Sequence, residues 1–285
     1  QVATLPDKLA DRAWLVSLAR VACSSNDGPP RPAQSLRLFA GGDETYDAIN
    51  SAIHAAQRQV HLEYYIFEPD VVGQRIRDAL TERALAGVKV RVLVDALGSA
   101  RAKPAFWAPL LDAGGEVRLF NPTRFLRFRP GAVNFRTHRK IVIVDGLHAF
   151  TGGINVGAGN SMMSSGSNAW RDTHLELRGA PALDLQVVFL EDWLFAGEET
   201  APVDRTAGDS ALDALQAEAA DWFPATPVLA PDHVGPWVQI IDSGPDEQVF
   251  DIHRFFFTAI SSARRRVWIT TPYFVPDEPI LMALS

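Results

Sequence analysis

The chain has 285 residues, of which 47% are hydrophobic, and a formal net charge of −7 at pH 7. This length and composition allow a sizeable core in one large or two medium domains. The acidic balance argues against a nucleic-acid binder that relies on an overall positive field. A single cysteine, Cys23, excludes an internal disulfide and a thiolate zinc site. No run of about eighteen apolar residues occurs, so we expect any membrane contact to be peripheral.

The order of predicted elements indicates an α/β fold. Residues 1–35 are expected to form a helical appendage and a breaker-rich linker. From residue 36 onward, strands and helices alternate, which predicts layers with a largely parallel or mixed sheet between helices. The predicted strands are 36–39, 60–67, 89–95, 116–120 and 141–144, and the predicted helices are 43–59, 74–86, 104–113 and 182–196.

A basic and aromatic stretch lies between residues 120 and 140. No acidic residue interrupts it, although the chain as a whole is acidic. Such a stretch suits an anionic membrane surface or a nucleic acid, and an exposed loop with phenylalanines packed beneath it is the simpler alternative. Its cations are Arg124, Arg127, Arg129, Arg136, Arg139 and Lys140.

The segment from His138 to Asn155 combines a base, a cation and two glycines. His138 and Lys140 are two positions apart on an extended chain, so their side chains point the same way. A neutral imidazole can attack phosphorus, and an ammonium can neutralise charge on the phosphate oxygens. Gly152 and Gly153 allow close backbone approach to a bound group, and Asn155 can add an amide donor. This pattern favours chemistry on a phosphate ester.

Asp172 is the candidate partner for the far ring nitrogen of His138, where a carboxylate would hold the tautomer. A surface ion pair, for example with Arg171, is the alternative. No second histidine or carboxylate stands at a recognisable metal spacing, so we expect neither a catalytic metal nor another cofactor.

The sequence also contains an internal repeat. Residues 51–70 align without gaps to residues 258–277, and eight of the twenty positions are identical. We therefore expect residues 36–200 to form a first unit, 201–236 a connector, and 237–285 the start of a second unit. An equivalent of His138 at the same spacing would fall beyond Ser285.

The pattern H-x-K-x4-D, followed by G-G-x-N, resembles the defining motif of the phospholipase D superfamily. That resemblance implies two α/β units, each donating one H-x-K motif to a shared site. By the same resemblance, His138 would become a phosphohistidine, Lys140 and Asn155 would hold phosphate oxygens, and Asp145 would stabilise the backbone of the motif.

Within the superfamily the sequence is most similar to the bacterial cardiolipin synthases, through phrases such as His61–Phe67, Trp170–His174 and Thr271–Asp277. This implies transfer of a phosphatidyl group between two phosphatidylglycerols, and peripheral association with the bacterial inner membrane. Gly152, Gly153, Arg124, Arg127, Arg129 and Arg136 are the expected substrate-binding residues. The open alternatives are a hydrolase, a dimeric phosphodiesterase or nuclease, and an inactive lipid-binding chain that lacks the second motif. A second unit, or a second chain, would have to complete the site.

Overall fold

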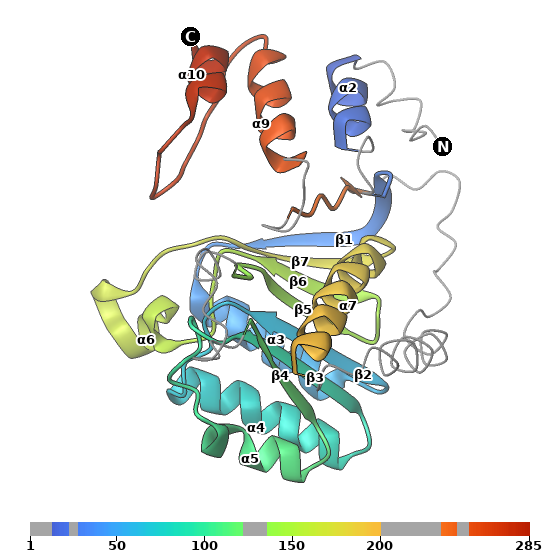
Figure 1. Ribbon diagram of the computed structural model, residues 1–285, viewed down its shortest axis with the longest axis vertical. Helices are drawn as coiled ribbons and strands as arrows, with labels where there is room; N and C mark the ends of the chain where they lie inside the picture. Colours follow the sequence, from blue (N-terminus) through green and yellow to red (C-terminus); the bar gives the residue numbers. More distant parts are fainter. Residues whose placement is uncertain (1–12, 23–27, 122–135, 201–234, 244–250) are drawn as a thin grey trace. The chain divides into compact units, whose positions relative to one another are not determined.

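The computed structural model describes residues 13–22, 28–121, 136–200, 235–243 and 251–285. The chain divides into two compact units, and Figure 1 labels most of their helices and strands. The larger unit comprises residues 32–236, and the smaller one comprises residues 1–31 together with 237–285.

The larger unit is built on a mixed β-sheet, as the alternating pattern predicts. Its strands are ordered β4-β3-β2-β5-β6-β7-β1. β2 pairs in parallel with β3, and β3 with β4, whereas β2–β5, β5–β6, β6–β7 and β7–β1 are antiparallel. The strands are β1 (Arg31–Phe39), β2 (Gln59–Tyr64), β3 (Lys89–Asp95), β4 (Glu116–Phe120), β5 (Lys140–Val144), β6 (His148–Gly152) and β7 (His174–Gly179).

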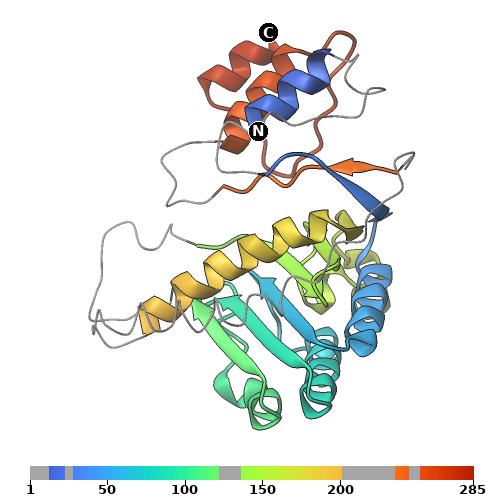
Figure 2. The same cartoon turned by 90° about the vertical axis from the view of Figure 1, so that its right-hand side faces the viewer.

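Helices cover both faces of this sheet. The helices α3 (Gly42–Ala55), α4 (Val71–Leu85) and α5 (Pro104–Asp112) lie on one face, and α7 (Pro181–Thr200) lies across the other (Figures 1 and 2). Between β6 and β7 lie the short helix α6 (Met162–Ser165) and two 3-10 helices (Ala158–Asn160 and Gly166–Asn168). α4 begins where Asp70 accepts hydrogen bonds from the first free backbone N–H groups of the helix.

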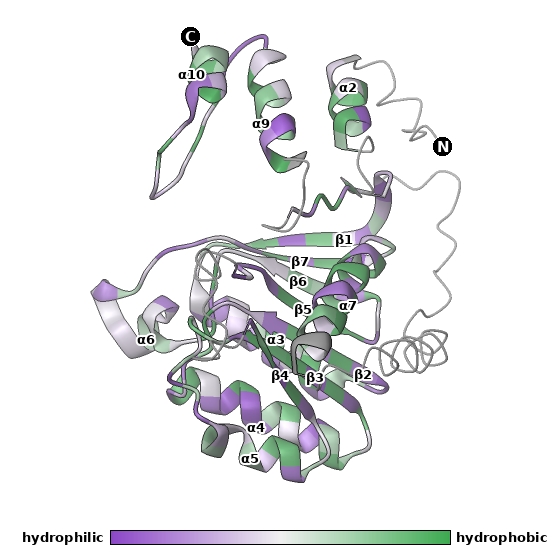
Figure 3. Cartoon of the chain, viewed as in Figure 1, coloured by the Kyte–Doolittle hydropathy of each residue, from purple (hydrophilic) through white to green (hydrophobic). Residues whose placement is uncertain are grey.

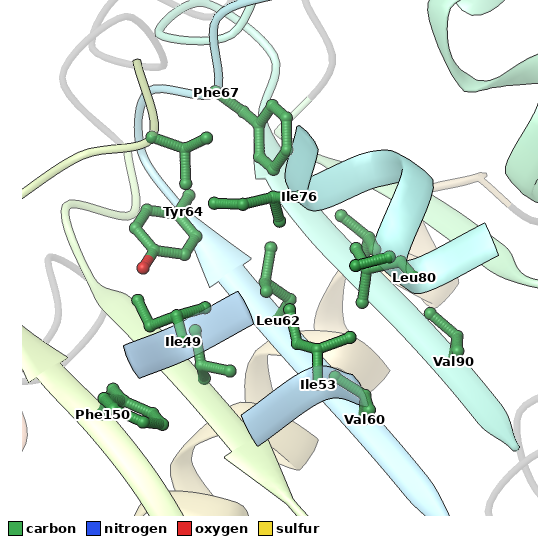
Figure 4. Close-up of a cluster of buried hydrophobic side chains, with 14 of the residues drawn as sticks. Ile49, Ile53, Val60, Leu62, Tyr64, Phe67, Ile76, Leu80, Val90 and Phe150 are labelled. Atoms are coloured by element: carbon green, nitrogen blue, oxygen red, sulfur yellow. The ribbon is translucent and has the colours of Figure 1, made fainter. Parts of the chain in front are cut away.

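The core between the sheet and α3–α4 follows strand alternation. On β2, the even-numbered Val60, Leu62 and Tyr64 point toward Ile49 and Ile53 of α3 (Figure 4). Each such apolar side chain contributes about 1.5–3 kcal/mol when fully buried. The odd-numbered residues of β2 face α7 instead. Helix α4 carries both hydrophobic and hydrophilic residues (Figure 3), and its buried residues include Ile76 and Leu80.

Several boundaries differ from the sequence expectation. β1 begins at Arg31, inside the predicted linker, because Pro32 is tolerated near the start of a strand at the edge of the unit. β6 was not expected as a strand, since its residues 148–152 carry no clear alternation. α3 ends at Ala55 rather than near Gln59, and the chain after it turns to meet Asp145.

Asp145, the aspartate of the motif, connects the end of β5 to the segment that precedes β2. Its Oδ1 accepts hydrogen bonds from the backbone N–H groups of Arg58 at 2.8 Å and Gln59 at 3.0 Å, and its Oδ2 accepts one from Gln57 at 3.0 Å. Its own N–H donates to the Gln59 carbonyl oxygen at 3.0 Å. These contacts fix the start of β2 against the end of β5.

The smaller unit contains α2 (Ala13–Ala22), β8 (Trp237–Val238), α9 (Asp251–Ser261) and α10 (Glu278–Leu284). α9 packs against both α2 and α10. An apolar groove of about 960 Å³ lies among Trp14, Leu18, Phe256, Ile260, Trp268 and Phe274. In the described part of the chain, no helix combines the length and the apolar character needed to cross a membrane.

The two units share local features at the repeat. Asp277 caps α10 by accepting from the N–H of Ile280, as its counterpart Asp70 caps α4. Residues 266–271, the counterpart of β2, do not form a strand. A strand in the middle of a sheet needs neighbours on both sides, and the described residues of the smaller unit provide none beside this segment.

We predict that Asp145→Ala destabilises the chain by about 2–4 kcal/mol, because three backbone N–H groups lose a charged acceptor. Asp145→Asn is the matched control. It keeps one acceptor oxygen and tolerates the positive φ of 51° at this position, so it should cost about half as much. Denaturant unfolding monitored by circular dichroism measures both. A loss below about 0.5 kcal/mol for the alanine variant would show that Asp145 does not anchor the segment that precedes β2.

Candidate functional site

The candidate site lies at one edge of the sheet, where several strand ends meet. Tyr64 at the end of β2 pairs with Lys140 at the start of β5. In the same way, Gly152 at the end of β6 pairs with His174 at the start of β7. β3 runs parallel to β2 and ends nearby at Asp95. The ends of five strands therefore meet at this edge.

His138 and Lys140 contact each other directly, as their spacing predicts. The Lys140 Nζ donates to the backbone carbonyl oxygen of His138 at 2.6 Å and lies 3.0 Å from its Nδ1. Lys140 is buried, whereas His138 is exposed. When Nδ1 accepts the lysine proton, a neutral imidazole carries its own proton on Nε2.

The ring of Tyr65 lies beside both His138 and Lys140. Its ring centroid lies 4.5 Å from that of His138, with 37° between the ring planes. The Lys140 Nζ lies 5.6 Å from the same ring, a distance at which the ring quadrupole attracts a cation. Tyr65 thus packs on the imidazole and stabilises the partly buried ammonium.

Burial and mutual repulsion lower the basicity of this pair. Desolvation and the charge of Lys140 lower the pKa of His138 below its ordinary 6.5, while Asp95 acts in the opposite direction. Desolvation lowers the pKa of Lys140 to about 8, and Asp172 opposes this shift. At pH 7 the imidazole is therefore mainly neutral and the lysine mainly charged. Attack on a phosphate ester requires these charges, a neutral imidazole beside a cation.

The two glycines leave room for neighbouring side chains. A Cβ atom at Gly153 would overlap the carboxylate of Asp172, and one at Gly152 would fall 2.8 Å from the Nδ1 of His174. The N–H of Gly153 donates to the Thr173 carbonyl oxygen at 2.9 Å, so it is not presented to a ligand. The glycines thus bring the start of β7 close to Lys140.

Asp172 does not hydrogen-bond His138 in this structure, in contrast to the sequence expectation. Its Oδ1 accepts from the N–H of Thr173 at 2.7 Å, and the exposed carboxylate lies within electrostatic reach of Lys140. The hydrogen-bond partner of the His138 ring is Lys140 instead. The carboxylate that was expected to orient the imidazole therefore lies close to the lysine.

His174 is a second imidazole at this edge. It is fully buried, and neither ring nitrogen has a hydrogen-bond partner among the described residues. Burial and the charge of Lys140 lower its pKa to about 4. It therefore stays neutral and adds no charge beside the lysine.

Asn155 lies at the same edge, and its backbone is held firmly. Its carbonyl oxygen accepts from the hydroxyl of Tyr46 at 2.7 Å, and its side-chain Oδ1 accepts from the N–H of Ile66 at 3.2 Å. Because Oδ1 is used in this way, the amide nitrogen is the part of the side chain that can donate to a ligand.

The described members of the basic stretch point inward. Arg136 donates to the Asn121 carbonyl oxygen at 2.8 Å, and its Nη1 lies 3.8 Å from the buried Asp95. Arg139 pairs with Asp192 of α7. These two arginines are therefore not part of an exposed patch, because buried carboxylates hold them. Arg124, Arg127 and Arg129 lie outside the described residues.

The structure gathers His138, Lys140, Gly152, Gly153, Asn155 and Asp172 at one edge, and it places Asp145 at the opposite end of β5 as a backbone anchor. Sequence reasoning missed Tyr65, Asp95 and His174. Tyr65 directly follows β2 and Asp95 is the last residue of β3, so their position at strand ends on this edge is the available signal. No set of three metal-ligating side chains gathers anywhere in the described ranges.

Comparisons with known proteins define the class. Residues 49–173 match the family model described as "Cardiolipin synthase, PLD-like domain". A solved phosphatidylserine synthase from Haemophilus influenzae Rd KW20 shares the fold, with a TM-score of 0.53 and 16% identity over 85% of this chain and 57% of that one. The family-model match, the mixed sheet and the H-x-K-x4-D motif agree that the chain carries a domain of the phospholipase D type.

Curated relatives with similar sequences include cardiolipin synthases. The one from Geobacillus kaustophilus is 37% identical over 269 residues, covering 94% of this chain and 50% of the relative. Cardiolipin synthase 2 from Bacillus cereus is 39% identical over 249 residues, covering 87% and 45%. The chain spans about half the length of the curated relatives it matches.

We predict that Lys140→Met raises the pKa of His138 toward 6.5, because the variant removes the positive charge that disfavours the imidazolium. A pH titration followed by NMR measures the shift, with the His138 signals assigned by their loss in His138→Ala. Lys103→Met, on the exposed surface, is the control and should leave the titration unchanged. An unchanged His138 pKa in Lys140→Met would mean that the two side chains do not interact in solution.

Proposed function

We propose that the protein containing this chain is a phosphatidyltransferase of the cardiolipin synthase type, which joins two phosphatidylglycerol molecules and releases glycerol. The observation that carries the proposal is the neutral, exposed imidazole of His138 with the charged Lys140 at 3.0 Å. The printed names of the relatives that match most of this chain support the choice of substrate.

In the first step, the Nε2 of His138 attacks phosphorus and the bond from phosphorus to the glycerol oxygen breaks. Nε2 is nucleophilic only when the ring proton is on Nδ1, and Lys140 occupies Nδ1 in this structure. We infer that a bound phosphate draws the ammonium to its non-bridging oxygens. The ring proton then moves from Nε2 to Nδ1, and Asp172, which lies near Lys140, becomes available to accept a hydrogen bond from Nδ1–H.

The leaving glycerol oxygen takes a proton from a general acid, which we assign to a second unit. In the second step that same group removes the proton from a hydroxyl of another phosphatidylglycerol. The hydroxyl oxygen attacks phosphorus, the bond from phosphorus to nitrogen breaks, and His138 is restored. The Asn155 amide and Lys140 would stabilise the negative charge in both steps.

The repeat supports a second unit that begins near residue 237. In the larger unit, Val60, Leu62 and Phe67 are fully buried, whereas their counterparts Val267, Ile269 and Phe274 are 40%, 48% and 57% exposed. Apolar residues at these positions predict burial in a sheet that further chain, or a second chain, would complete.

The substrate is a lipid, so we propose that the protein works at a membrane surface with which it associates peripherally. Arg124, Arg127 and Arg129 of the basic stretch would attract anionic headgroups, at on the order of 1 kcal/mol each. The bacterial inner membrane is the location that this function favours.

The test is a headgroup-exchange assay on phosphatidylglycerol vesicles, comparing this chain with a version extended through a complete second unit. We expect only the extended form to make cardiolipin. In that form, His138→Ala should lower the rate at least about a thousandfold, because the nucleophile is gone. His54→Ala, on the exposed face of α3, is the control.

Near-normal exchange by a folded His138→Ala variant would contradict the proposed nucleophile. Turnover of any phosphodiester by the short chain alone would instead mean that two copies pair around one site, and the dimeric phosphodiesterase would become the better account.

A further inference from the structure

Two carboxyl groups lie beneath the reactive segment, on the face of the sheet that α7 covers. Glu63 of β2 is fully buried, and Asp192 of α7 is 8% exposed. The Glu63 Oε2 has no hydrogen-bond donor among the described residues, and the two carboxyls lie within hydrogen-bond contact of each other. Repulsion between two adjacent buried carboxylates disfavours the ionised form of Glu63. In agreement, burial and Asp192 raise the pKa of Glu63 well above its ordinary range.

Each carboxyl holds a residue next to His138. The hydroxyl of Thr137 donates to the Glu63 Oε1 at 2.6 Å, and the Arg139 guanidinium pairs with Asp192. Thr137 and Arg139 thus point toward α7, one on each side of His138 in the sequence. In an extended chain, the residue between them must point to the opposite face. That face is where Lys140 and Tyr65 meet the imidazole.

We propose that Glu63 and Asp192 form a positioning pair for His138. By binding the side chains that flank the histidine, the positioning pair fixes the backbone from Thr137 to Arg139 and so holds the imidazole against Lys140 and Tyr65. Neither carboxyl reaches the reacting side of the sheet. This role concerns the geometry of His138 alone, so it can be tested without turnover and independently of the proposed function.

Other polar groups on this face do not replace the positioning pair. His61, the next residue of β2 on the α7 side, is bound to Gln186 and stacks on Phe189. Arg91 of β3 pairs with Glu116 and lies over Trp193. The charged groups that act on His138 are Lys140 and Asp95, and Asp95 also lies within hydrogen-bond reach of the Thr137 backbone N–H.

The test compares Glu63→Gln with Glu63→Ala in the 285-residue chain, using the NMR-titrated pKa of His138 as the readout. A glutamine amide can accept from Thr137 and donate to Asp192, as a protonated glutamic acid does. We expect Glu63→Gln to keep the lowered pKa of His138. We expect Glu63→Ala to raise it toward 6.5, as Lys140→Met does, because the imidazole loses its contact with the ammonium.

Two further variants complete the design. Thr137→Val removes the hydroxyl with little change of shape and should also raise the His138 pKa, so it decides the question if Glu63→Ala fails to fold. Glu176→Gln, on β7, is the control for the glutamate-to-glutamine change and should have no effect.

If the pair served only stability, substituting Glu63 or Thr137 would lower the unfolding temperature and leave the His138 titration unchanged. The proposal is therefore overturned if folded Glu63→Ala, or Thr137→Val in its place, titrates at His138 like the wild type. It is also overturned if Glu63→Gln shifts the pKa as much as the alanine variant, since the negative charge of Glu63 would then be the relevant property.

Discussion

The candidate site depends on one constraint: a strand presents alternate side chains to opposite faces, and both faces of β5 are covered. Val142 and Val144 pack toward α3 and α4, whereas Ile141 and Ile143 pack toward α7. A shift of register by one residue would place all four on the wrong face. The same alternation, continued before β5, directs His138 and Lys140 to one side and Thr137 and Arg139 to the other. The apolar core therefore determines where the reactive side chains point.

The chemistry follows from the resulting closeness of two basic groups. In water both would be protonated near pH 6, but beside each other in a partly buried place they compete for positive charge. The lysine keeps its proton because its pKa of about 8 lies above that of the imidazole. The histidine is thus left neutral and exposed. The neutral His174 and the ring of Tyr65 maintain this arrangement without adding charge.

Much of this was predictable from the sequence. The alternating pattern gave the mixed sheet, and the H-x-K spacing gave the shared face of His138 and Lys140. The direction of Arg136 and Arg139 was not predictable, because it depends on Asp95 and Asp192, which come from distant parts of the chain. For the same reason, sequence spacing could not show Glu63 as the partner of Thr137. Strand β6 and the start of β1 lacked a periodic signal and are set by pairing with their neighbours.

The measurement that tests the account most directly is covalent trapping on the protein completed by its second unit. The enzyme would be mixed with phosphatidylglycerol, quenched in alkali during turnover, digested and analysed by mass spectrometry. The account predicts a phosphatidyl group on the peptide that carries His138, and none in the His138→Ala variant. Turnover with the lipid adduct on another residue, or with no adduct at His138 under conditions that preserve phosphohistidine, would contradict it.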